Sequence, residues 1–167
     1  MCIEDRLLKE LLQESVNKCY REESEEDDLS LIKRGMEQAS AARIFYHMQT
    51  LINSDMRYTS LQGYKLDCEY YKNNNESKRT PRFHNGTKPD LLLHKRDTSI
   101  GNLMIVEFKS FKNSGRKYPE TNQCMDEIKL EDFTAQDGYN YQLGVWVKLK
   151  KTGPEFIFFK NGSQVLE

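Results

Sequence analysis

The hydrophobic periodicity of the chain changes after residue 55, and this change restricts the fold more than any other feature of the sequence. Before it, residues 3–20 and 29–52 repeat apolar side chains at the three- and four-residue spacing of amphipathic helices. After it, residues 64–71 alternate apolar and polar side chains, as a half-buried strand does. The pattern therefore predicts a helical start followed by a sheet.

The rest of the chain continues with short apolar runs separated by polar segments that contain glycine or proline. These runs predict strands at 90–94, 103–109, 139–150 and 155–160, and a helix at 123–135. The resulting order, α-α-β-β-β-α-β-β, predicts an α/β (α+β) fold with a central mixed β-sheet flanked by helices. A length of 167 residues suits a single domain. Within it we expect a helical N-terminal extension at 1–28, a core at 29–150, and a final strand and tail at 151–167.

Charge is unevenly distributed along a chain whose formal net charge is only −1. Six of the seven residues at 22–28 are acidic, whereas basic residues gather in the loops that precede and follow the 90–109 segment. A protein segregated in this way can hold a polyanion on one side, although solvated loop charges explain the pattern equally simply. The basic residues that we consider candidates for nucleic-acid contact are Lys72, Lys78, Arg79, Arg82, Lys88, Lys112, Arg116 and Lys117.

The cysteines and the apolar runs bear on the compartment in which the protein acts. The four cysteines form no CxxC pair and no zinc-ligand spacing, so they are typical of reduced thiols in a cytoplasmic protein. No apolar run approaches the ~18 residues that a membrane span needs, and no signal-peptide core is present. We therefore expect a cytoplasmic protein without a membrane partner.

The strand predicted at 103–109 ends in two charged side chains. Glu107 and Lys109 are two residues apart, so they point to one face of the strand, while Met104, Val106 and Phe108 point to the other. If the strands at 90–94 and 103–109 form a hairpin, Asp90 comes to lie near Glu107. Two carboxylates and a lysine would then converge at the end of an otherwise apolar strand.

Such a cluster suits a metal ion, because buried charge is costly unless it is paired or binds metal. Two carboxylates repel each other unless a cation lies between them, and oxygen ligands favour a hard ion such as Mg²⁺ or Mn²⁺. Glu37 lies on the apolar stripe of the second predicted helix, so it is a candidate supporting acid. An exposed ion pair at a strand end, or a misjudged helix phase at Glu37, are the alternatives.

The segment Pro89-Asp90, followed by Glu107-Phe108-Lys109 after a hydrophobic strand, resembles the PD-(D/E)XK nuclease superfamily. The resemblance extends to the order of elements, since that family has a restriction-endonuclease-like αβββαβ core and this chain would add an N-terminal helix. It implies that Asp90, Glu107 and the backbone carbonyl of Phe108 are metal ligands, that Lys109 is the catalytic lysine, and that Glu37 supports the site and its metal. Within this superfamily, the chain resembles small uncharacterised bacterial and phage-type members.

One feature departs from the resemblance. Many members carry a Gln-x-x-x-Tyr-like pattern on the helix after the motif, where this chain has Asp126, Lys129 and Glu131. Subfamily and substrate therefore stay open, and Lys129 joins the candidates for phosphate contact.

The resemblance implies a Mg²⁺- or Mn²⁺-dependent endonuclease or phosphodiesterase that hydrolyses nucleic acid, DNA rather than RNA, by metal-activated water. A homodimer would suit cleavage of both strands of a duplex. The alternative is a catalytically inactive module of the same fold that recognises nucleic acid or a partner protein. Metal binding at Asp90 and Glu107 separates the two hypotheses.

Overall fold

The computed structural model describes most of the chain: residues 3–24, 32, 35–70, 72–73, 76–96, 98, 100–112, 116–117 and 123–166. It is an α+β fold built on one six-stranded mixed sheet, in agreement with the predicted fold class. Within these residues no helix is long and apolar enough to cross a membrane.

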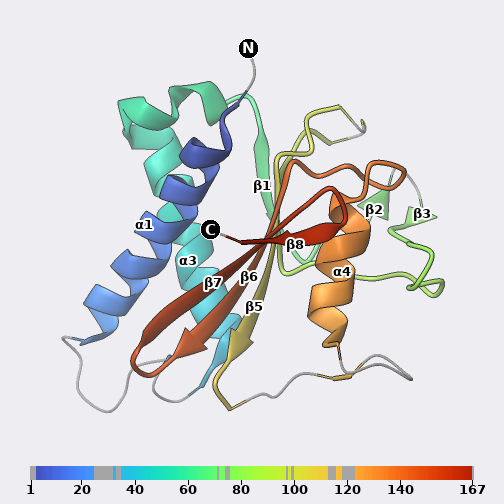
Figure 1. Ribbon diagram of the computed structural model, residues 1–167. Coiled ribbons are helices and arrows are strands. Elements are labelled where there is room, and N and C mark those ends of the chain that lie inside the picture. The colour runs from blue at the N-terminus through green and yellow to red at the C-terminus, as the bar shows by residue number, and fades with distance from the viewer. Residues whose placement is uncertain are drawn as a thin grey trace.

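The sheet has the order β1-β4-β5-β6-β7-β8 (Figure 1). Only β5 and β6 run parallel, and the other neighbours are antiparallel. The strands are β1 (Lys65–Cys68), β4 (Leu91–His94), β5 (Met104–Ser110), β6 (Leu143–Lys150), β7 (Gly153–Lys160) and β8 (Ser163–Val165). A separate two-stranded hairpin, β2 (Lys72–Asn73) and β3 (Glu76–Ser77), lies in the segment predicted as a loop.

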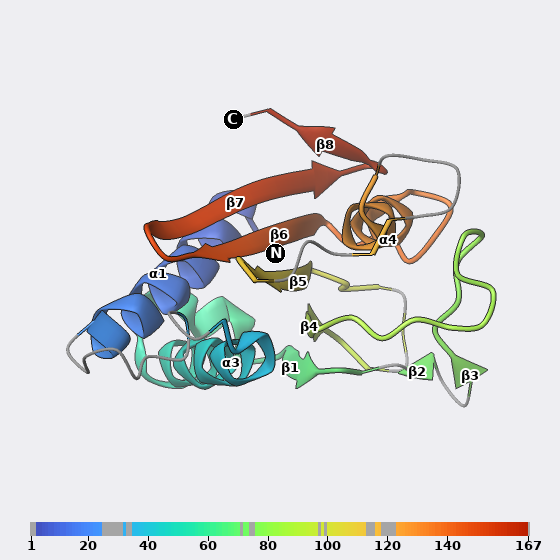
Figure 2. The same ribbon diagram turned by 90° about the horizontal axis from the view of Figure 1, so that it is seen from below.

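Helices cover both faces of the sheet (Figures 1 and 2). On one face lie α1 (Asp5–Ser24) and α3 (Glu37–Ser54), and on the other lies α4 (Met125–Thr134). Both predicted N-terminal helices are present, although the second begins at Glu37. The part of that prediction at 29–31 and 33–34 falls outside the described residues.

Strict alternation along β4 and β5 divides the core into two layers. Leu91 and Leu93 pack with α1 and α3, as do Met104, Val106 and Phe108 of β5, whereas Leu92 and Ile105 pack with α4. The side chains of α1 contribute to the first layer from five fully buried positions: Leu8, Leu11, Leu12, Val16 and Cys19. This alternation places Glu107 and Lys109 on the α4 side of the sheet.

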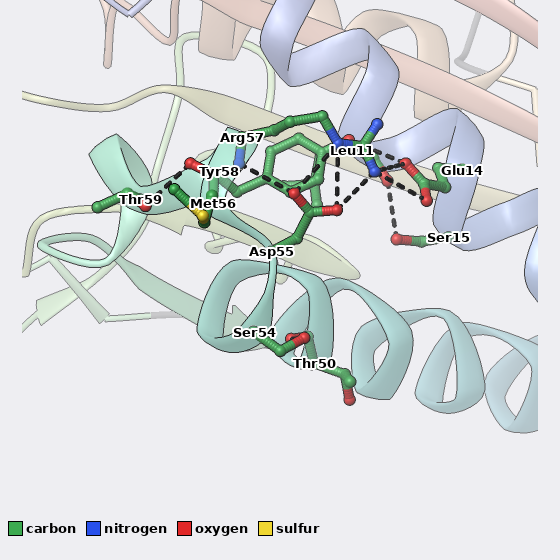
Figure 3. Close-up of polar contacts among 10 residues, drawn as sticks. All are labelled: Leu11, Glu14, Ser15, Thr50, Ser54, Asp55, Met56, Arg57, Tyr58 and Thr59. Carbon is green, nitrogen blue, oxygen red and sulfur yellow. Dashed lines mark hydrogen bonds and ion pairs between the residues drawn. The ribbon is translucent and has the colours of Figure 1, made fainter.

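A polar junction joins α1 to the short 3₁₀ helix η1 (Met56–Leu61), which follows α3 (Figure 3). Asp55 caps η1 by accepting a 2.9 Å hydrogen bond from the Arg57 backbone N–H. The Arg57 guanidinium also reaches Glu14 of α1 at 3.0 Å, and the buried Tyr58 hydroxyl donates to the same carboxylate at 3.1 Å. The junction holds α1 against α3 at the end of the helix pair away from Glu37.

Candidate active site

The C-terminal end of β5 meets the N-terminal ends of α3 and α4 at one edge of the molecule (the lower edge in Figure 1). Here β5 extends past its neighbour β4. The first residue of β4, Leu91, pairs with Val106, so residues 107–110 of β5 have no β4 residue beside them. On the other side β6 pairs with β5 as far as Ser110. The β5 edge is therefore open on one side only, where backbone groups need other partners.

Two carboxylates fill this open edge. Asp90 accepts a 2.8 Å hydrogen bond from the Phe108 backbone N–H through Oδ2. Glu37 accepts a 2.8 Å hydrogen bond from the next N–H on that side, that of Ser110, through Oε2. In a strand the N–H and C=O of one residue point to the same side, so the Phe108 carbonyl points to this edge as well. The two predicted carboxylates and the predicted carbonyl ligand therefore share one edge.

Glu107 is the most buried member of the cluster, with 2% of its surface exposed. Its Oε2 accepts a 2.7 Å hydrogen bond from the Lys129 ammonium, whereas its buried Oε1 has no hydrogen-bond partner among the residues that the structure describes. Burial raises the pKa of Glu107 to about 8; the Lys129 charge opposes this shift, and the Asp90 and Asp126 carboxylates add to it. Burial likewise raises the pKa of Asp90, against the hydrogen bond from Phe108. An unpaired buried carboxylate oxygen is expensive, and a bound ion is one accepted reason for such an oxygen.

The two lysines of the site are each held by a carboxylate. The Lys109 ammonium lies 2.9 Å from Asp126 and 3.7 Å from Glu37. Burial by itself lowers the pKa of Lys109, but Asp126 and Glu37 more than offset it, so the pKa is raised. The same balance, with Glu107 as partner, raises the pKa of Lys129. Both amines therefore stay charged at neutral pH.

The donor set fits a hard divalent cation. Four carboxylates, those of Glu37, Asp90, Glu107 and Asp126, stand against two ammonium groups, so the fully ionised cluster lacks two positive charges. Among the described residues, no three His, Cys, Asp or Glu side chains form a ready-made metal-binding group. The protein ligands would thus be few: the free oxygen of Glu107, Asp90 and the Phe108 carbonyl. That is the sparse oxygen set around which Mg²⁺ keeps several of its waters.

Two hollows of opposite charge adjoin the cluster. One, of about 370 Å³, is lined by the acidic side chains of Glu37, Glu69 and Asp90 together with Gln38, Ala41, Ala42 and Cys68. The other, of about 470 Å³, is lined by Phe83, Gly86, Thr87, Lys88, Lys109, Arg116, Met125, Asp126 and Lys129. We call the second hollow the basic groove. It brings Lys88, Arg116 and Lys129, three of the predicted nucleic-acid contacts, close to the carboxylate cluster.

The other predicted contacts lie elsewhere. The Arg82 guanidinium binds Glu131 and Asp132 of α4, and Lys78 is buried beside the rings of Tyr70 and Tyr139. Lys112 lies near the Phe111 ring, while Arg79 and Lys117 are exposed outside the groove. The side chain of Lys72 is outside the described part of the structure.

Asp126 is a site residue that the sequence reasoning did not place. It is three residues before Lys129 on α4, so the two share the helix face that covers the sheet. That spacing was the available signal, but only the packing of α4 on β5 shows that Asp126 reaches Lys109. His94 is at the other end of β4, buried and 2.9 Å from Asp67.

In comparisons with known proteins, no family model and no curated protein matched this chain.

Proposed function

We propose that the protein is a Mg²⁺- or Mn²⁺-dependent nuclease that hydrolyses phosphodiester bonds of nucleic acid. The observation that carries the proposal is the buried Oε1 of Glu107, which lacks a hydrogen-bond partner among the described residues and lies near Asp90 and the open edge of β5. A buried carboxylate oxygen of this kind can serve as a ligand of a divalent ion. The resemblance of Asp90, Glu107 and Lys109 to the PD-(D/E)XK motif supports the same activity.

Each residue has a role in this proposal. Asp90, Glu107 and the Phe108 carbonyl would hold the ion, which when bound lowers the pKa of a coordinated water and polarises the phosphate. Glu37 holds the end of β5 through Ser110 and faces Lys109. The oxygen of the attacking water bonds to phosphorus as the bond to the leaving ester oxygen breaks; the water releases one proton to solvent, and the departing oxygen takes one proton up from solvent.

Lys109 acts as a charged donor in this scheme rather than as a base. Asp126 keeps the pKa of Lys109 above the ordinary lysine value, so this amine holds its proton at neutral pH. A fixed ammonium can stabilise the negative charge that grows on the phosphate oxygens during attack. Asp126 is then a positioning residue, because its contact is with Lys109.

A cleavage assay tests the proposal. Labelled DNA and RNA oligonucleotides, single- and double-stranded, are incubated with wild-type protein in Mn²⁺, Mg²⁺ or EDTA. We expect cleavage that requires the metal, is greater for DNA than for RNA, and is abolished by Glu107→Gln and by Lys109→Ala. Metal-dependent activity that survives Lys109→Ala unchanged would remove this lysine from the mechanism. Absence of cleavage together with nucleic-acid binding would favour the inactive binding module.

A further inference from the structure

The basic groove has the composition of a site for one nucleotide of a strand. Among the described residues that line it, four side chains are cationic, namely Lys88, Lys109, Arg116 and Lys129, and one, Asp126, is acidic. Phe83 and Met125 add apolar surface to the same lining. The cationic surface suits a phosphate, because phosphates bind Lys and Arg. The apolar surface suits a base, because bases stack on aromatic rings.

The depth of the cations limits what can reach them. Lys109 and Lys129 are at the floor of the groove, with side chains only 15% and 11% exposed. Lys88 is at the rim, half exposed, and its 2.8 Å pair with the equally exposed Glu69 is of the kind that contributes little. Arg116 is exposed and makes no ion pair within the described residues. A phosphate must therefore enter the groove to meet the floor lysines.

One wall of the groove is held in place by hydrogen bonds and by contacts with α4. It is formed by the turn at 80–87, in which the Gly86 N–H donates to the Phe83 carbonyl and the Thr87 N–H donates to the Lys78 carbonyl. Thr80 and Arg82 tie this turn to Asp132 of α4 at 2.5 Å and 2.7 Å. Gly86 has φ +91°, and a Cβ there would stand 3.1 Å from the Ser77 Cβ. The turn therefore does not move away from α4 without breaking these contacts.

From these features we propose that the basic groove binds an unpaired strand, with one base against Phe83 and its phosphate over Lys109 and Lys129. A groove of about 470 Å³ bounded by a pinned turn admits a single strand, whose base can turn away from its neighbours. A duplex keeps its bases stacked inside and cannot present one to Phe83 without paying for unstacking. This inference rests on the proposed function for its biological meaning, but the binding it describes needs no metal and no cleavage.

The test is binding in EDTA, measured by fluorescence anisotropy with one labelled sequence prepared as a single strand and as a blunt hairpin duplex, in DNA and in RNA. We expect the single strand to bind at least about tenfold more tightly than the duplex. Phe83→Leu, which keeps an apolar side chain but removes the ring, should weaken single-strand binding about tenfold and leave duplex binding unchanged. Arg116→Ala should reduce the slope of log affinity against log salt by about 0.7. Lys95→Ala, at the opposite end of β4, is the matched control and should change nothing.

Equal or tighter binding of the duplex, or a Phe83→Leu protein that is folded by circular dichroism and binds the single strand as wild type does, would overturn the inference. The DNA and RNA arms show which sugar the groove prefers. Single-strand binding without cleavage in Mn²⁺ would support the groove and defeat the nuclease proposal. Cleavage with no preference for the single strand would support the nuclease proposal and defeat the single-strand groove.

Discussion

The Glu107 carboxylate binds the Lys129 ammonium through one oxygen, at 2.7 Å, and its other oxygen is buried with no hydrogen-bond partner in the described part of the chain. The two oxygens therefore have different environments. One pairs with Lys129 of α4, and the other makes no hydrogen bond within the described residues. This asymmetry has consequences for stability that can be measured without any substrate.

Removing Lys129 should destabilise the protein, because the buried carboxyl group of Glu107 would lose the ammonium group that pairs with it. We expect Lys129→Met to lower the free energy of unfolding in EDTA by about 3 kcal/mol, as measured by urea denaturation. Adding Glu107→Gln to the same protein should recover most of that loss, since a neutral amide needs no cationic partner. Glu107→Gln alone completes the cycle, and a loss in the double variant equal to the sum of the two single losses would mean that the two residues are not energetically coupled.

Asp126 should matter to catalysis and little to metal binding, because it contacts Lys109 and not the open edge of β5. For Asp126→Asn we expect cleavage to fall about 10- to 100-fold while Mn²⁺ affinity stays within about threefold of wild type. Asp137→Asn, an exposed carboxylate after α4, serves as the control. A large loss of Mn²⁺ affinity in Asp126→Asn would instead make this residue a ligand.

The buried Lys78 should give the protein a stability that depends on pH. Burial lowers the pKa of this amine to about 8 from an ordinary value of 10.5. Between these values the unfolded chain holds more protons at this site than the native protein, so the free energy of unfolding rises with pH, by at most about 1.4 kcal/mol per unit. The facing rings of Tyr70 and Tyr139, with His94 and Arg96 behind them, supply no carboxylate that would hold the charged form.

To measure this effect, the unfolding free energy is compared at pH 7.5 and 9.5 for wild type and Lys78→Met. We expect the unfolding free energy of wild type to rise relative to that of Lys78→Met between pH 7.5 and 9.5. The unfolding free energy of the exposed control, Lys95→Met, should change with pH as that of wild type does. Parallel pH profiles for wild type and Lys78→Met would show that the Lys78 amine stays charged in the fold.

Local pattern predicted the part of the site that lies on β4 and β5. Alternation along the strand predicted that Glu107 and Lys109 share a face, and the hairpin of β4 and β5 was predicted from their spacing; the structure confirms both. The phase of the second helix placed Glu37 toward the core, and its carboxylate reaches Ser110. These relationships follow from repeats of two and 3.6 residues, which a sequence displays directly.

Long-range pairing accounts for what the pattern did not predict. Arg82 resembled a free loop cation, but its partners Glu131 and Asp132 are on a helix about fifty residues later. Asp126 reaches Lys109 only because the first turn of α4 packs beside the end of β5 that carries Lys109. The hairpin of β2 and β3, the short β8 and η1 were also not predicted, since two to six residues carry too little periodicity to be recognised.

The most direct test of the central claim is calorimetric titration of Mn²⁺ into wild-type protein, Asp90→Ala and Glu107→Gln, with each fold checked beforehand by thermal unfolding. The account predicts binding to wild type and loss of that binding, by tenfold or more, in both variants. Absence of Mn²⁺ binding in all three folded proteins, or equal affinity in all three, would contradict a metal site built on Asp90 and Glu107.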